Sequence, residues 1–108
     1  MTTDQVKYVV EDLLEDKMDV ITPLSKCLYL VLTKQECKFV WLKNYLFNFD
    51  SANEVLRVYP YRIVKEIPAD NSNYFEANGV IYECMQDDDG NVLCDIYPFD
   101  QIISFKLV

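Results

Sequence analysis

The sequence predicts an α+β domain in which an acidic N-terminal helix packs on a mostly antiparallel β-sheet with a C-terminal β-meander. Three observations predict it. Apolar residues recur at three- and four-residue steps near the N-terminus, short apolar runs with turn signals follow, and an Asp-Gly turn joins two strand-like runs in the last third. The length of 108 residues fits a single domain, 1–108. A small closed barrel built from the second half is the alternative architecture.

Residues 3–18 are expected to form the helix. Its apolar positions share one face: Val6, Val9, Val10, Leu13, Leu14 and Met18. Thr2 and Gln5 fit a capping box, in which each side chain bonds the other residue's backbone N–H. Asp16 and Asp19 near the C-terminal end oppose the helix dipole, so we infer that the acidic face is kept for another reason.

The middle of the chain allows two interpretations. Residues 27–42 are interpreted as a β-hairpin, because apolar residues alternate with others from Cys37 to Trp41. A helix within 33–49, opened by a capping box that begins at Thr33, is the alternative.

A second capping-box pattern, Ser51 with Glu54, predicts a short helix through about Val58 that Pro60 ends. Residues 61–67 then read as a strand.

The last third carries the clearest signals. Residues 74–86 and 91–97 are strand-like and are joined by Asp87-Asp88-Asp89-Gly90, where glycine accepts a positive φ without steric cost. Residues 98–101 make the next turn, and 102–107 form the last strand. Strict alternation predicts Ile103, Phe105 and Leu107 on one face of that strand, and Ile102, Ser104 and Lys106 on the other.

Charge limits the chemistry and the partners. The chain has 18 Asp and Glu against 10 Lys and Arg, a formal charge of −8, and no histidine. Such a charge repels nucleic acid and anionic membranes and attracts basic surfaces, so we expect no direct nucleic-acid binding and no membrane binding. Without histidine the usual general base and the commonest metal ligand are missing. We therefore expect a protein that is not an enzyme, with no catalytic residues and no cofactor.

The acidic residues fall into two groups. On the predicted helix Glu11, Glu15 and Asp19 are four residues apart, and so are Asp12 and Asp16, which gives two neighbouring ridges of carboxylates. Asp87, Asp88 and Asp89 form the second group, at the predicted turn. We expect both groups to contact the partner, although a solvated surface is the plainer explanation for each.

The second acidic group also invites a calcium interpretation. An EF-hand loop in this register would place Ile96 at its twelfth position, where a carboxylate is required. We therefore expect no metal site.

The cysteines are expected to be reduced thiols. Cys27, Cys37, Cys84 and Cys94 show no close pair of the kind that binds zinc, and the first residues lack the features of a secretory signal. These observations predict a cytoplasmic protein, in the host cytoplasm if the chain is viral. Cys84 would face Cys94 across a hairpin closed by a loop at 88–90, and a disulfide could then form on oxidation.

In size, charge and mixed architecture the chain resembles small acidic inhibitors of phages and mobile elements, including anti-CRISPR proteins and nucleic-acid mimics, and also immunity proteins paired with nuclease toxins. The resemblance implies a phage-type inhibitor that occludes the nucleic-acid-binding surface of a basic, nucleic-acid-processing protein. It carries over no individual residue. The alternative function is a structural or adaptor subunit that oligomerises or pairs through a β-sheet edge.

Overall fold

The computed structural model describes residues 1–14, 17–24, 26–33, 36–39, 45–68 and 73–107. They form one short N-terminal helix followed by strands that pair antiparallel, so the α+β prediction is confirmed. The elements in chain order are α1 (Thr3–Leu14), β1 (Thr22–Pro23), β2 (Leu28–Leu32), β3 (Glu36–Phe39), β4 (Tyr45–Asp50), β5 (Val55–Val64), β6 (Tyr74–Ala77), β7 (Val80–Cys84), β8 (Asp95–Pro98), the 3-10 helix η2 (Phe99–Gln101) and β9 (Ile102–Leu107).

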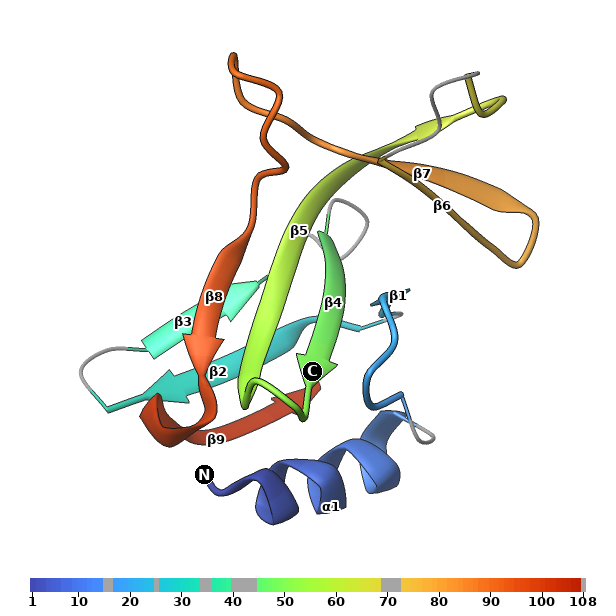
Figure 1. Ribbon diagram of the computed structural model, residues 1–108. Coiled ribbons are helices and arrows are strands. Elements are labelled where there is room, and N and C mark those ends of the chain that lie inside the picture. The colour runs from blue at the N-terminus through green and yellow to red at the C-terminus, as the bar shows by residue number, and fades with distance from the viewer. Residues whose placement is uncertain (15–16, 25, 34–35, 40–44, 69–72, 108) are drawn as a thin grey trace.

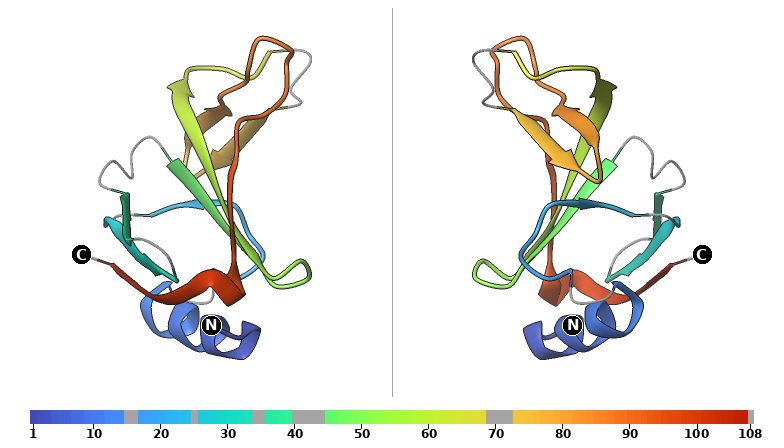
Figure 2. Two further views of the ribbon diagram at one scale, coloured as in Figure 1. Left: turned by 90° about the vertical axis from the view of Figure 1, so that its left-hand side faces the viewer. Right: turned by 90° about the vertical axis from the view of Figure 1, so that its right-hand side faces the viewer.

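The strands form two sheets. The larger has the order β1-β4-β5-β7-β6, with β8 also paired to β5, and the smaller has the order β3-β2-β9. Figures 1 and 2 show α1 and β9 at one end of the molecule and the β6–β7 hairpin at the other. The main core joins α1 to both sheets and consists of Val6, Val10, Leu24, Leu28, Leu30, Phe47, Phe49, Leu56, Val58, Phe99, Ile102 and Phe105.

A second, smaller cluster lies on the other face of β4 and β5. Leu46, Tyr61 and Tyr82 are its buried members. Neighbouring residues of β4 therefore serve different cores, since Phe47 belongs to the main cluster while Leu46 belongs to the second.

Helix α1 begins as predicted and ends earlier. The N–H of Gln5 donates to Thr2 Oγ1 at 3.2 Å and the N–H of Thr2 donates to Gln5 Oε1 at 2.8 Å, which confirms the capping box. The helix ends at Leu14 instead of residue 18, and residues 15–16 lie outside the described residues. Met18 forms an isolated β-bridge with Phe49, so tertiary pairing has displaced the last turn of the predicted helix.

The hairpin predicted for residues 27–42 is confirmed over its described part. Strands β2 and β3 pair antiparallel from Leu28↔Phe39 to Val31↔Glu36, and residues 40–42 lie outside the described residues. The alternative helix within 33–49 is wrong, because Tyr45–Asp50 is strand β4.

The helix predicted from Ser51 and Glu54 is also wrong. A turn at 51–54 joins β4 to β5, and both members of the apparent capping box bond elsewhere. The hydroxyl of Ser51 donates to Asp19 Oδ2 at 2.7 Å, and the Glu54 carboxylate accepts from Thr3 Oγ1 at 2.9 Å. Strand β5 runs through Val58 and Pro60 to Val64, and the strand predicted for 61–67 is only its second half.

A hairpin divides the strand predicted for residues 74–86. Asn78 and Gly79 have φ values of 53° and 78° and form the two-residue loop between β6 and β7. Positive φ at both positions is the geometry of a type I′ turn, which Asn-Gly favours because neither residue is strongly penalised there.

The C-terminal strands do not form a meander. Strand β8 pairs with β5 instead of β7, and β9 crosses to the smaller sheet to pair with β2. The bounds predicted for the last strand are confirmed, as is the turn before it, which is η2.

The predicted faces of β9 are wrong at its start. Ile102 is buried and Ile103 is 58% exposed, so Ile102, and not Ile103, shares the buried face with Phe105. The ladder shifts from Val31↔Ser104 to Leu32↔Ile102, so Ile103 is the extra residue of a β-bulge and strict alternation is broken there.

Two strands pair with the same edge of the long strand β5. Strand β4 covers one edge of β5 over Val55–Pro60, so β8 lies on the other edge, and the sheet order places β7 there as well. Strand β7 pairs with Tyr61–Val64 and β8 with Val55–Val58, so the two run in line along β5.

Between β7 and β8 the chain leaves this edge. The register places Met85 opposite Pro60 and Asp95 opposite Val58, which leaves room for one residue opposite Tyr59. The chain has nine residues there, 86–94, and they project from the sheet (Figure 1). We call residues 86–94 the finger.

Pro60 marks the point of departure. The N–H of Met85 donates to the Pro60 carbonyl at 3.0 Å, and in an antiparallel ladder Pro60 would return a second hydrogen bond. Proline has no N–H to donate. The Met85 carbonyl accepts instead from the N–H of Leu93, at 2.9 Å, and this bond closes the base of the finger.

We predict that the fold does not need the finger. Deleting residues 86–93 joins Met85 to Cys94 and leaves the one residue that the ladder accommodates. Each halving of a loop lowers its closure cost by about 0.6 kcal/mol, so the shortened chain should unfold at an equal or higher temperature. Thermal unfolding followed by circular dichroism measures this. A chain that fails to fold would show that the finger is structural.

Acid should weaken the turn between β4 and β5. The Asp50 carboxylate accepts hydrogen bonds from Asn53 and Arg57, which lower its pKa from 3.8 to about 2. A carboxylate with a depressed folded-state pKa stabilises the fold above its unfolded pKa and loses that contribution as pH falls through the folded value. Stability should therefore fall as pH drops from about 4 to about 2.

Urea unfolding of the wild type and of Asp50→Asn at pH 5 and pH 2.5 tests this. The variant should be less stable at pH 5 and should lose less stability on acidification. Asp100→Asn, which removes one exposed charge, is the control. Equal acid sensitivity of wild type and Asp50→Asn would contradict the prediction.

Candidate partner-binding site

The structure separates the two groups of predicted site residues. Glu11 and Asp12 are exposed on α1, whereas Asp87, Asp88 and Asp89 lie at the tip of the finger. Figure 1 shows these elements at opposite ends of a molecule whose longest dimension is 40 Å. The two groups therefore do not form one compact site. Glu15 and Asp16 lie outside the described residues.

Asp19 has a structural role that the sequence did not reveal. It follows the helix instead of continuing it, with a φ of 60°, and its N–H donates to the Phe49 carbonyl at 2.9 Å. Its carboxylate accepts from the N–H and the hydroxyl of Ser51, both at 2.7 Å, and these bonds lower its pKa. The predicted ridge of Glu11, Glu15 and Asp19 is therefore wrong at its last member.

The Asp87 side chain stabilises the tip of the finger by accepting hydrogen bonds from its backbone. Its Oδ1 accepts from the N–H of Asp89 at 3.0 Å and from the N–H of Asn91 at 2.9 Å. Together with the backbone bond from the Gly90 N–H to the Asp87 carbonyl, these contacts confirm the predicted turn. The hydrogen bond from the Asn91 backbone is the largest cause of a lowered pKa at Asp87. The Asp87 carboxylate therefore favours its ionised form, and its oxygen atoms accept the hydrogen bonds that hold the turn.

Asp88 and Asp89 differ from Asp87 in what their side chains contact. Both are exposed, and their carboxylates make no hydrogen bond or ion pair with any described residue. A carboxylate that already accepts hydrogen bonds from the protein has fewer free acceptor positions. The oxygen atoms of Asp88 and Asp89 remain available to a ligand or to water.

Apolar side chains flank the acidic tip. Val92 and Leu93 on the finger are 38% and 41% exposed, Met85 at its base is 36% exposed, and Ile96 just beyond it is 55% exposed. Gln86 and Val92 form an isolated antiparallel bridge, so the finger is a short hairpin of two arms. Burial of such apolar side chains against a partner would contribute to affinity.

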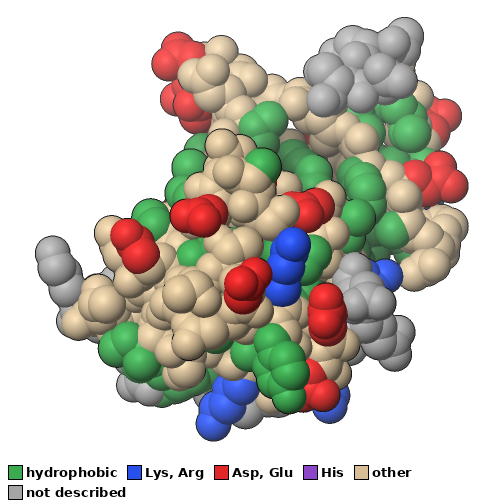
Figure 3. Space-filling model, turned by 60° about the horizontal axis from the view of Figure 1, so that its bottom comes forward, with side chains coloured by type: hydrophobic (Ala, Val, Ile, Leu, Met, Phe, Trp, Pro, Cys, Tyr) green, Lys and Arg blue, Asp and Glu red, His purple; other side chains and the backbone are tan. Residues whose placement is uncertain are grey.

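Elsewhere the carboxylates are only partly neutralised. The ion pairs among the described side chains are Asp50 with Arg57 and Glu83 with Arg62, both centred on β5. Glu83 also accepts from the Tyr74 hydroxyl, the largest cause of its lowered pKa. Figure 3 shows more carboxylates than basic groups on the face that carries α1, and a further cluster at the upper left, where the finger lies.

The helix end of the molecule has its own exposed apolar residues. Tyr8 on α1 is 74% exposed and lies in one depression with Ile103, the residue that the β9 bulge turns outward. Asp4 borders the same depression. The sequence did not predict the bulge, because isoleucine is usually buried and its presence at position 103 gives no sign of exposure.

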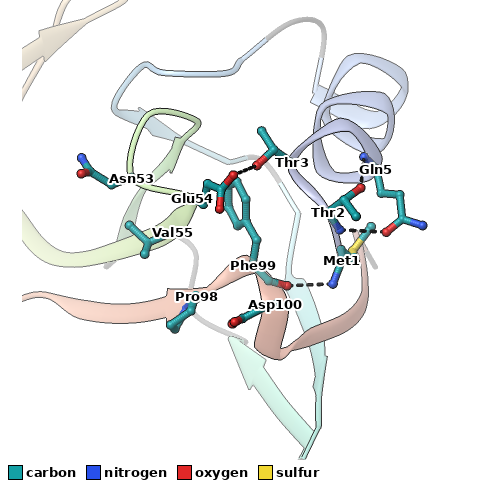
Figure 4. Close-up of a pocket in the computed structure, with 10 residues that line it drawn as sticks. All are labelled: Met1, Thr2, Thr3, Gln5, Asn53, Glu54, Val55, Pro98, Phe99 and Asp100. Carbon is teal, nitrogen blue, oxygen red and sulfur yellow. Dashed lines mark hydrogen bonds between the residues drawn. The ribbon is translucent and has the colours of Figure 1, made fainter.

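An open depression of about 620 Å³ lies between the start of α1, the β4–β5 turn and η2. Figure 4 shows Glu54 and Asp100 on different sides of it, not pointing toward each other. Glu54 already accepts a hydrogen bond from the Thr3 hydroxyl, and the Met1 nitrogen donates to the Phe99 carbonyl at 2.8 Å. The arrangement does not resemble the facing carboxylate pair of a hydrolase.

Among the described residues, no three Cys, Asp or Glu side chains are grouped closely enough to hold a metal ion. The helices in this part of the chain are too short and too polar to cross a bilayer.

The geometry therefore points to the finger as the candidate site. Its signal in the sequence was the run of three aspartates before Gly90, but the projection itself depends on a long-range pairing that composition does not reveal. No protein-family model, no curated protein and no solved structure matches the chain.

Proposed function

We propose that the protein is a non-enzymatic inhibitor that binds a basic, nucleic-acid-processing protein in the cytoplasm and occludes its nucleic-acid-binding surface. One observation carries the proposal. The ladder needs one residue between Met85 and Asp95, yet the chain places nine there and presents Asp88 and Asp89 unpaired at the tip. A loop that the fold does not need is available for recognition.

The charge of the chain favours a basic partner. A formal charge of −8 attracts cationic surfaces at long range, which raises the association rate. At close range Asp88 and Asp89 can occupy positions where the partner holds phosphates, and the apolar side chains of Val92 and Leu93 can slow dissociation. The acidic side chains of α1, including Glu11 and Asp12, extend the same negative field over the other end.

A second candidate function is pairing through a sheet edge. Strand β6 is the last strand of the larger sheet, and its outer edge is unpaired by any described strand. An edge of this kind can accept a strand from another chain. Binding through backbone hydrogen bonds would be insensitive to salt, which separates this function from the first.

We predict that charge reversal at the finger tip abolishes partner binding. The doubly substituted variant Asp88→Lys with Asp89→Lys should capture the partner at least about tenfold less well than the wild type from a cell extract at low salt. The reason is that two attractive contacts with the partner become repulsive. Wild-type capture should itself weaken steeply as salt rises, because counterions screen exposed charges.

The matched control changes net charge equally at a different place. Glu66→Lys with Glu76→Lys alters two exposed carboxylates outside the finger and should retain most of the binding. Glu11→Lys with Asp12→Lys asks whether the α1 end also contributes. The captured protein should lose binding to a labelled oligonucleotide when the wild type is added.

Three results would overturn the proposal. They are a finger-tip variant that binds as well as the wild type, a loss of binding in the control alone, and a captured protein that is acidic. A partner retained at high salt whose capture depends on β6 would favour edge pairing.

A further inference from the structure

Helix α1 carries an aromatic side chain on its solvent face, at the end of the molecule opposite the finger. Tyr8 is 74% exposed, whereas Val6 and Val10 on the core face of the same helix are fully buried. Each residue advances about 100° round an α-helix, so Tyr8 lies about 160° from both valines. It therefore occupies the centre of the face where an amphipathic helix normally carries polar residues.

Strand β9 brings a second apolar side chain to the same place. Ile103 is 58% exposed because it is the extra residue of the bulge in β9, and a bulge of this kind re-aims a side chain. Tyr8, Val9 and Ile103 line one open depression of about 420 Å³. Two elements far apart in the sequence thus expose apolar side chains side by side.

Carboxylates surround Tyr8 along the helix. Asp4 lies four residues before it, and Glu11 and Asp12 lie three and four residues after it, the spacings that make helical side chains neighbours. All three are exposed and form no ion pair with a described residue. Lys7 is the one base between residues 4 and 12, about 100° round the helix from Tyr8. Figure 3 shows apolar and acidic side chains interspersed on the face that carries α1.

These five residues form what we call the helix surface: Asp4, Tyr8, Glu11, Asp12 and Ile103. Protein interfaces commonly have a core that is depleted in charge and enriched in aromatic residues, with a polar rim around it. The helix surface has the same arrangement, with Tyr8 and Ile103 at its centre and the carboxylates at its rim.

The charges of the rim identify the kind of partner. A second copy of this chain is disfavoured, because a two-fold contact centred on Tyr8 would bring carboxylates of the two copies together whichever way the helices run. A basic segment is favoured instead. Its Lys and Arg side chains can pair with the rim while an apolar side chain enters the depression.

We propose that the helix surface is a docking site for a basic amphipathic segment of a partner protein. The apolar side chain of the segment displaces water from Tyr8 and Ile103, which contributes to affinity, and the carboxylates select for a basic sequence. The inference goes beyond the proposed function, because the helix surface and the finger lie at opposite ends of the molecule (Figure 1).

Titration of the isotope-labelled protein with a synthetic peptide, followed by NMR, tests the inference. The probe is a helical peptide of about 14 residues with Leu on one face and Lys on the other. The control peptide has Gln in place of each Leu and the same charge. We expect saturable chemical-shift changes at residues 4–12 and 102–104, with the control peptide binding at least about tenfold more weakly. Added salt should weaken the binding, because counterions screen exposed carboxylates.

Substitutions separate the apolar centre from the rim. Tyr8→Ala should weaken peptide binding about tenfold, and alanine favours the helix at that position. Ile103→Thr keeps the β-branched shape and should weaken binding about threefold. Ile63→Thr, which alters an isoleucine of similar exposure on β5, is the matched control and should bind like the wild type. Glu11→Gln with Asp12→Asn should make binding less sensitive to salt.

The finger-tip variant Asp88→Lys with Asp89→Lys distinguishes this inference from the proposed function. At about 0.15 M salt the screening length is about 8 Å, so a change at the far end of a molecule 40 Å long should leave peptide binding at the helix surface unchanged. The wild-type shift map decides the question even if a variant folds poorly. Shift changes confined to the finger, equal binding of the control peptide, the absence of saturable binding, or a dimer that depends on Tyr8 would each overturn the inference.

Discussion

The missing N–H of Pro60 is the constraint on which the upper half of the molecule depends. Strand β5 bonds Met85 through the Pro60 carbonyl but has no N–H to return, so the Met85 carbonyl takes its hydrogen bond from Leu93. The chain leaves the sheet after Met85, and the hydrogen bond from the Leu93 N–H to the Met85 carbonyl closes the finger at the same point. The eight residues that the ladder along β5 cannot accommodate therefore project from the sheet at this point.

Carboxylates in this chain serve two different purposes, and the structure distinguishes them by their partners. Asp19, Asp50 and Asp87 each accept hydrogen bonds at a turn, and these bonds lower their pKa values. The largest cause is a side-chain hydrogen bond from Asn53 at Asp50 and a backbone N–H at Asp19 and Asp87. Asp88 and Asp89 have no such partners among the described residues. Net charge alone cannot separate structural from available carboxylates, because both kinds contribute equally to it.

The sequence predicted the features that depend on neighbours along the chain. The Thr2 capping box, the turn before Gly90 and the last strand are local, and all three were confirmed. Prediction failed where distant residues compete for the same groups. The Ser51 hydroxyl donates a hydrogen bond to Asp19 instead of capping a helix, and Met18 forms a β-bridge with Phe49.

The same reasoning explains why the candidate site was found only in part. Three consecutive aspartates are visible in the sequence, but their projection depends on pairings 25 or more residues apart, such as Pro60 with Met85. The pairing places the tip beyond the sheet, with Val92 and Leu93 exposed beneath it. Exposed apolar side chains that lie beside one another can form a contact surface, whereas charge by itself also serves solubility. Unpaired carboxylates and exposed apolar side chains occur together on a loop longer than the ladder requires, and this combination is the basis of the proposal that the finger serves recognition.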